Sequence, residues 1–192
     1  MSKTRLEAFS DGVLAIIVTI MVLEMKVPKG TSFEDLRSVL GIFLSYILSF
    51  VFVLIYWNNH HHLFQVVKHV NGRVLWANGH LLFWLSLLPF VSAWMGTTHF
   101  AALPVLCYAI VAFMSGFAYT ILTKSLAKIH DDQSIFKKSI STKRKELISL
   151  YLYIFAVLIA YFYPLVACAV FIFVAIMWLM PDKNVEKIIK SK

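Results

Sequence analysis

The chain has 192 residues, of which 60% are hydrophobic, 15% are aromatic and only 15% are charged. Its mean hydropathy is +0.77 and its formal net charge is +8. Soluble globular domains carry less apolar sequence and more charge, so this composition excludes a soluble enzyme or binding module and indicates an integral membrane protein.

The first apolar segment, residues 4–25, carries an acidic group near its start. Its uncharged stretch from Gly12 to Leu23 is too short to cross about 30 Å of hydrocarbon, so the helix is expected to begin near Lys3. Asp11 then lies at or inside the membrane boundary. A charged side chain in a membrane costs about 2.5–3.5 kcal/mol unless it faces protein or water. Asp11 is therefore a candidate functional residue.

Further spans follow from long stretches that contain no Asp, Glu, Lys or Arg, namely residues 38–67, 74–123 and 147–181. About 20 apolar residues cross a bilayer, so the second and third stretches each hold two helices. Breaks at residues 95–98 and 161–164 then give expected spans over residues 36–64, 74–95, 99–124, 143–162 and 164–180. Thr31 and Ser32, followed by acidic residues, are typical of a helix start. The sequence predicts an all-α bundle of six membrane helices that forms one domain over residues 1–192.

The basic residues predict the orientation of the bundle. Fifteen of the 18 Lys and Arg residues belong to the segments that lie on the same side as both termini. The positive-inside rule therefore places both termini in the cytoplasm of a multi-pass protein of the cell membrane. These residues flank membrane ends, so we expect the lipid bilayer, and not nucleic acid, to be their partner.

One side of the first helix is apolar. At about 100° per residue, Ile16, Ile20 and Leu23 share a face, and Thr19 lies about 60° from Ile16. Asp11 points about 140° away from Ile16. Taken alone, this pattern also fits a stripe that faces lipid or the bundle core, which most membrane helices show.

Asp11 needs a hydrogen-bond donor, and the neighbouring helices offer several. The second span ends in Trp57-Asn58-Asn59-His60-His61-His62, and the third begins near Trp76, Asn78 and His80. We predict a polar cluster that ties the first three helices together through Asp11, Asn58 and one histidine, drawn from His61, His62 and His80. Consecutive histidines diverge by about 100° on a helix and cannot all bind one metal, so no metal site or cofactor is predicted.

The motif Arg5-x-x-x-Phe9-Ser10-Asp11 at the start of the first span resembles the signature of the transmembrane protein 175 family. These are lysosomal potassium channels with bacterial and archaeal homologues. Residues 14–23, the stretch at residues 56–61 and the six-span layout resemble the family as well. The resemblance implies a homotetramer around a central pore that the first helices line.

The resemblance also implies roles for individual residues. Ile16 corresponds to the family's pore constriction, with further apolar rings at Ile20 and Leu23, and Thr19 matches the hydroxyl linked to potassium preference. The signature residues would serve packing and assembly near the cytoplasmic mouth: Arg5, Phe9, Ser10 and Asp11.

The expected function is therefore passive conduction of potassium and other monovalent cations, with no enzymatic activity. Apolar rings can gate a pore by dewetting, and the chain contains no Thr-Val-Gly-Tyr-Gly filter, so modest selectivity is expected. An alternative is a secondary transporter that couples to ions or protons through Asp11. Transporters usually place such groups near the bilayer midplane, whereas Asp11 lies near one edge. A membrane metal enzyme built on the histidines is a second rival.

Overall fold

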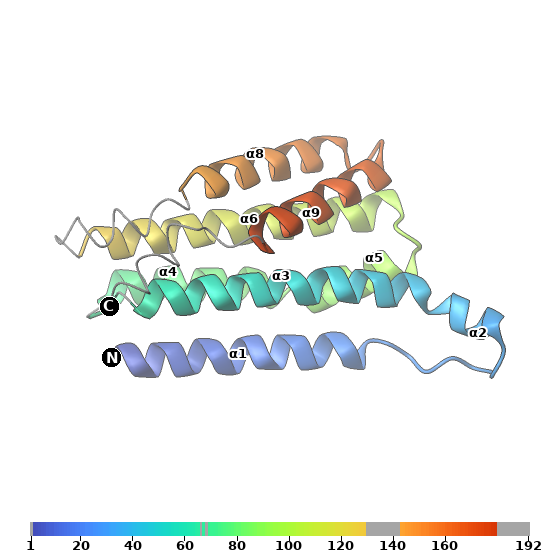
Figure 1. Ribbon diagram of the computed structural model, residues 1–192, viewed down its shortest axis with the longest axis horizontal. Coiled ribbons are helices and arrows are strands. Elements are labelled where there is room, and N and C mark those ends of the chain that lie inside the picture. The colour runs from blue at the N-terminus through green and yellow to red at the C-terminus, as the bar shows by residue number, and fades with distance from the viewer. Residues whose placement is uncertain (1, 66, 68, 130–142, 180–192) are drawn as a thin grey trace.

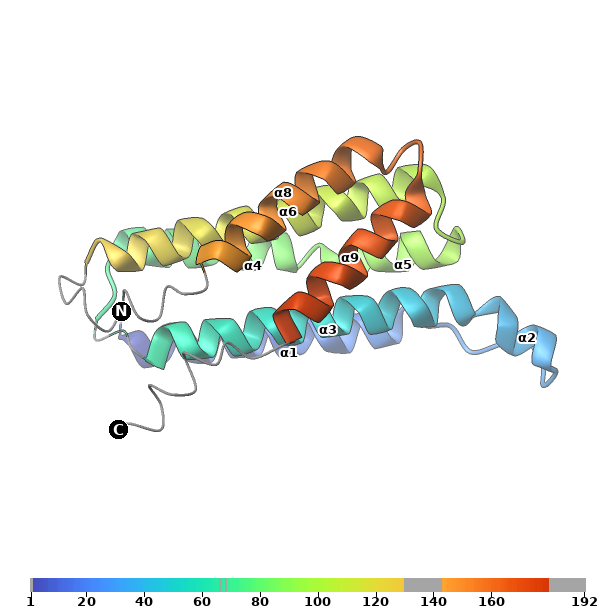
Figure 2. The same ribbon diagram turned by 45° about the horizontal axis from the view of Figure 1, so that its top comes forward.

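A computed structural model describes residues 2–65, 67, 69–129 and 143–179. Its helices are α1 (Lys3–Leu23), α2 (Phe33–Ser38), α3 (Leu40–Gln65), α4 (Gly72–Leu85), α5 (Leu88–Thr97), α6 (Ala102–Ala127), α8 (Lys143–Ile159) and α9 (Pro164–Leu179). Most of them run along the long axis of the molecule, and α2 projects beyond one end (Figures 1 and 2). The basic residues counted within residues 130–142 and 180–192 lie outside the described part of the chain.

Four described segments are long and apolar enough to cross a membrane: Lys3–Leu23, Leu40–Gln65, Gly72–Thr97 and Ala102–Ala127. The last two helices are shorter, with 17 residues in α8 and 16 in α9. At 1.5 Å per residue they extend about 24–26 Å. The predicted class, an all-α membrane protein, is therefore confirmed.

The segment expected as one span over residues 74–95 is divided into two helices. α4 ends at Leu85 and α5 begins at Leu88, with Pro89 in the first turn of α5. Proline lacks a backbone N–H and its ring clashes with the carbonyl group four residues earlier, which here belongs to Leu85. The Ser86 hydroxyl donates to the carbonyl oxygen of Phe83 at 2.7 Å and so covers a carbonyl at the end of α4.

The α3–α5 contact is the closest helix packing in the described bundle that involves glycines. A Cβ atom added to Gly41 of α3 would lie 2.5 Å from the carbonyl oxygen of Gly96 in α5. Small residues allow such an approach in membrane proteins. Nearby, the buried Ser49 hydroxyl donates to Ser92 Oγ at 2.9 Å and lies 3.1 Å from the Tyr108 hydroxyl. These contacts hold α3, α5 and α6 together independently of α1.

α1 lies at the edge of the bundle and packs against α3, α4 and α5 (Figure 1). Its buried residues recur at intervals of three or four, as expected for one face of a helix: Leu6, Ser10, Leu14, Ile17 and Met21. The opposite face is exposed in the single chain. In a membrane, that face must contact lipid, another protein chain or a water-filled path.

Candidate functional site

The exposed face of α1 carries every residue that the sequence analysis assigned to the pore. Ile16 is 59% exposed, Ile20 is exposed as well, and Leu23 is 74% exposed. Thr19 also lies on this face. The predicted apolar stripe is therefore a continuous open surface and does not form part of the bundle core.

The hydroxyl group of Thr19 makes one hydrogen bond within its own helix. Its Oγ1 donates to the carbonyl oxygen of Ala15, one turn earlier, at 2.9 Å. A hydroxyl that donates within its own helix keeps its lone pairs free to accept. Thr19 can thus present oxygen lone pairs to a cation on the open side of α1.

Ser10 of the signature motif lies on the opposite, buried face with 0% exposure. Its hydroxyl donates to the Leu6 carbonyl oxygen and accepts from Asn78 Nδ2, both at 2.9 Å. The other end of the amide, Asn78 Oδ1, lies 2.8 Å from His60 Nε2. Since all three polar side chains are buried, this chain of hydrogen bonds fixes α1 to α3 and α4.

The remaining signature residues are exposed in the single chain. Asp11 accepts a hydrogen bond from Trp57 Nε1 of α3 at 3.0 Å, and the Trp57 ring stacks on His61 at a centroid distance of 6.0 Å. The donor to Asp11 thus comes from a neighbouring helix, as expected, but it is an indole. Arg5 and Phe9 lie on the exposed surface of α1.

The polar residues predicted to join Asp11 do not hydrogen-bond to it in the described structure. His61 pairs with Gln65 of its own helix, and His80 accepts from Trp84 of its own helix, both at 2.9 Å. Asn58 is exposed, and His62 has a buried Nδ1 with no hydrogen-bond partner in the described structure. Within the described residues, no group of three or more His, Cys, Asp or Glu side chains could hold a metal ion.

The observed cluster therefore joins the predicted helices through different side chains. His60 and Asn78 replace the predicted members, and Ser10 takes the place of Asp11. A signal for Ser10 was present in the sequence, because it is spaced four residues from both Leu6 and Leu14 on the buried face of α1.

Comparison with known proteins identifies the family. The family model described as "Endosomal/lysosomal potassium channel TMEM175" matches residues 5–89. A potassium channel of Chryseobacterium sp. strain P1-3 is 55% identical over 191 residues, which cover 100% of both chains. A mouse endosomal/lysosomal proton channel, TMEM175, is 33% identical over 155 residues, covering 70% of this chain and 30% of that protein.

A solved structure agrees with this relationship. The crystal structure of a lysosomal potassium-selective channel TMEM175 homolog from Chamaesiphon minutus superposes with a TM-score of 0.81 at 26% identity, covering 92% of this chain and 96% of that one. The overlap extends well beyond residues 5–89 and includes most of the bundle. The chain belongs to the TMEM175 family.

Proposed function

We propose that this chain is a passive, potassium-preferring cation channel in which four copies surround a central pore lined by α1. Membership of a potassium channel family supports the activity. The observation that carries the pore assignment is the two-sided character of α1, whose buried face is fully packed while Ile16, Thr19 and Leu23 lie open. Four such faces around an axis would enclose an apolar path with a ring of hydroxyl groups.

In this arrangement Ile16 forms the constriction, with Ile20 and Leu23 as further apolar rings. Apolar rings oppose conduction because a narrow path of this kind loses its water, and a hydroxyl ring can replace part of the hydration shell of an ion. The oxygen of Thr19 is suited to that role, because its proton is donated to Ala15. No ring of carboxylates lies on this face, so a preference for divalent cations is not expected.

The signature residues lie near one end of α1, and two of them attach this end of the helix to its neighbours. Ser10 anchors the helix through Asn78, and Asp11 is held by Trp57. Arg5 and Phe9, which are exposed in the single chain, would contact neighbouring copies near the pore mouth. With the basic segments in the cytoplasm, this mouth is the cytoplasmic one and the channel resides in the cell membrane.

Recording in planar bilayers under opposed potassium and sodium gradients tests the proposal. We expect currents that reverse near the potassium equilibrium potential. Ile16→Ala should raise the conductance because it widens the constriction, whereas Val18→Ala, a change at a half-buried position of the same helix, should not. Unchanged conductance in Ile16→Ala would remove Ile16 from the constriction.

A matched pair of variants tests the role of Thr19 in selectivity. Thr19→Ala should lower the permeability ratio of potassium to sodium. Thr120→Ala is the control, because Thr120 donates to its own helix in the same way, to Gly116 at 3.0 Å, but lies on α6. Equal ratios in the two variants would exclude Thr19 from selectivity.

Proton conduction is the second candidate, because the mouse relative is named a proton channel. Asp11 is an exposed acidic group near one end of α1. A reversal potential that follows the proton gradient, and that is lost in Asp11→Asn, would favour this function. A reversal potential that follows potassium at every pH favours the channel proposed above.

A further inference from the structure

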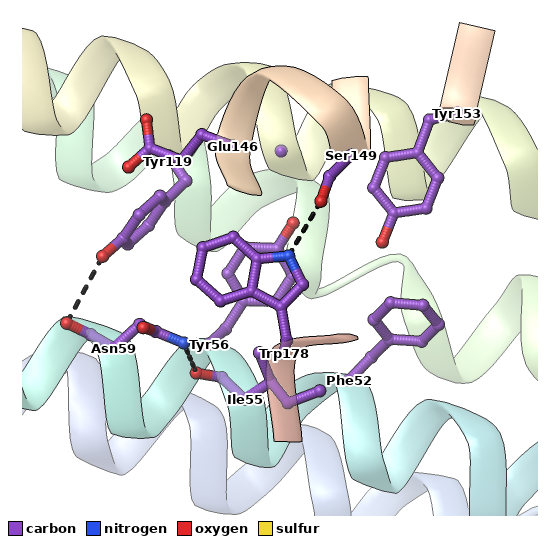
Figure 3. A pocket seen from close by; sticks show the side chains of 10 residues that line it. Phe52, Ile55, Tyr56, Asn59, Tyr119, Glu146, Ser149, Tyr153 and Trp178 are labelled. Atoms are coloured by element: carbon purple, nitrogen blue, oxygen red, sulfur yellow. Dashed lines mark hydrogen bonds between the residues drawn. The ribbon is translucent and has the colours of Figure 1, made fainter. Parts of the chain in front are cut away.

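A groove opens at the end of the bundle opposite the start of α1, where α2 joins α3 and the turn between α5 and α6 lies against α3 (Figure 1). Its volume is about 570 Å³, within the roughly 300–1,000 Å³ that ligand sites occupy. An enclosed cavity between α3, α6, α8 and α9, lined mostly by aromatic side chains (Figure 3), has a volume of only about 30 Å³. The groove, and not this cavity, is large enough for a ligand head group.

One wall of the groove is a stripe along one side of α2 and α3. Glu34 and Arg37 of α2 form its polar end. Leu40, Gly41 and Leu44 continue it along the membrane-spanning helix α3. These residues follow one another at intervals of three or four, and a single residue in helical conformation separates the two helices. The wall therefore changes from charged to apolar along its length.

The opposite wall comes from the turn between α5 and α6. His99 and Phe100 have φ angles of 50° and 61°, in the left-handed region that residues other than glycine rarely adopt. The Phe100 N–H donates to the carbonyl oxygen of Met95 at 2.9 Å and so closes the turn. A Cβ atom added to Gly41 would lie 3.5 Å from His99 Nδ1. The missing side chain at Gly41 thus leaves room for the imidazole next to α3.

The charged side chains of the groove are available to a ligand. Asp35, the other acid of α2, accepts a hydrogen bond from the Ser32 N–H at 3.0 Å and belongs to the helix cap. Glu34 and Arg37 are exposed, and their side chains make no hydrogen bond or ion pair within the described part of the chain. The imidazole of His99 likewise makes no hydrogen bond there. The groove therefore offers one carboxylate, one guanidinium and one imidazole.

We propose that this groove binds a phospholipid whose head group carries a phosphate and a primary ammonium, as in phosphatidylethanolamine. The guanidinium of Arg37 has a fork of N–H donors that matches a phosphate, and His99 adds a further N–H. The ammonium group has three N–H donors for the carboxylate of Glu34. Residues three apart on a helix have Cβ atoms about 5–6 Å apart, so the two charges of the wall are neighbours, as they are in this head group.

The apolar part of the groove indicates a lipid and not a soluble molecule. Leu40 and Leu44 are each 48% exposed and provide a surface for an acyl chain next to the charged end. Tyr161 and Tyr163, at the turn between α8 and α9, are exposed at the same end of the bundle (Figure 1). Tyr side chains concentrate at the head-group level of a bilayer, so the charged end of the groove lies near that level.

The charges of the groove also distinguish between head groups. A purely anionic head group, such as phosphatidylglycerol, would meet the carboxylate of Glu34 beside Arg37. A choline head group has no N–H to donate to that carboxylate. The ethanolamine head group satisfies both charged side chains.

Native mass spectrometry of the purified full-length protein tests the proposal. The protein is titrated in detergent with phosphatidylethanolamine, phosphatidylcholine or phosphatidylglycerol of identical acyl chains, and the affinity for the first lipid bound per subunit is measured. We expect phosphatidylethanolamine to bind about fivefold more tightly than either of the others. Glu34→Gln should remove this preference over phosphatidylcholine. Arg37→Gln should weaken the binding of all three lipids, because all three carry the phosphate.

Two matched variants control for loss of charge alone. Glu24→Gln and Lys29→Gln change exposed charges in the connection between α1 and α2, outside the groove, and should leave the affinities unchanged. All four substituted positions are exposed, so the variants are expected to fold. Equal affinities for the three lipids in the unaltered protein would overturn the proposal. An unchanged preference in Glu34→Gln, or unchanged affinities in Arg37→Gln, would do the same.

A competition experiment separates a lipid from its free head group. Phosphoethanolamine, at the same concentration as the lipid, should displace less than about a tenth of it, because it lacks the acyl chains that contact Leu40 and Leu44. Complete displacement would overturn the assignment to a lipid. None of these results depends on ion conduction, so they stand or fall independently of the proposed channel.

Discussion

The two faces of α1 differ in what covers them: the bundle packs on the inner face, and the outer face is open in the single chain. The inner face has apolar residues at regular spacing, and its single buried hydroxyl, on Ser10, is fully hydrogen-bonded. The outer face has similar apolar residues, such as Ile16 and Leu23, with nothing packed on them in the single chain. Hydrophobicity alone therefore does not separate structural from functional residues here. Structural and functional residues of α1 are distinguished by which side of the helix the rest of the bundle covers.

Asn78→Ala is expected to weaken the contact between the inner face of α1 and α4. Removing the amide leaves His60 Nε2 without its hydrogen-bond partner in a buried site and leaves Ser10 with only its bond to the Leu6 carbonyl oxygen. A buried group left unpaired costs about 1–3 kcal/mol. Asn58→Ala is the control, since Asn58 is exposed on α3. Denaturation in detergent measures both variants, and equal stabilities would show that the cluster does not hold α1.

Leu14→Ala and Ile16→Ala compare the two faces directly. Leu14 is buried, so its truncation should lower the unfolding free energy by about 2–5 kcal/mol. Ile16 is exposed, and its truncation should change the stability of the subunit by no more than about 0.5 kcal/mol while it alters the current. Equal losses of unfolding free energy in the two variants would contradict the assignment of Leu14 to a packed face and Ile16 to an open one.

A smaller effect is expected where the faces meet, at the Asp11–Trp57 hydrogen bond. Trp57→Phe keeps an aromatic ring but removes the donor, and should cost about 0.5–1.5 kcal/mol. Trp76→Phe serves as control, because Trp76 is highly exposed and makes no hydrogen bond within the described structure. The same denaturation assay applies, and a larger loss in Trp76→Phe would contradict the assignment.

The smallest effect concerns acid, which should leave the inner face of α1 packed and should loosen α2. Hydrogen bonds from Ser32 lower the pKa of the Asp35 carboxyl group below its usual value of 3.8. Because the folded pKa is the lower one, the cap stabilises α2 above the unfolded pKa and is lost as the pH falls through the folded pKa. NMR shifts of α2 should change in that acidic range, and Asp35→Asn should remove the change.

The apolar pattern was enough to predict an all-α membrane protein and an apolar stripe on α1, but not the division of residues 74–95 into α4 and α5. The full-length relative confirms the family that the motif at Arg5–Asp11 indicated. On α1 the buried residues and the open residues Ile16, Ile20 and Leu23 recur at the same intervals of three or four, so the spacing alone did not show which side the bundle covers. The resemblance to the family supplied that expectation.

The members of the polar cluster could not be predicted in the same way. α3 is apolar on nearly every side, so its sequence does not reveal whether Asn58 or His60 turns inward. That choice depends on how α3 packs against α1 and α5, including the close approach of Gly41 to Gly96. The break between α4 and α5, in contrast, had a visible signal in Pro89.

Cysteine accessibility along α1 tests the central claim most directly. In a background that lacks Cys107 and Cys168, single cysteines replace Leu23 on the outer face and Met21 on the inner face. A charged, water-soluble thiol reagent, applied to both sides of the membrane, should reduce the potassium current of Leu23→Cys and leave that of Met21→Cys unchanged. Current that is insensitive at Leu23→Cys but sensitive at Met21→Cys would contradict a pore lined by the open face of α1.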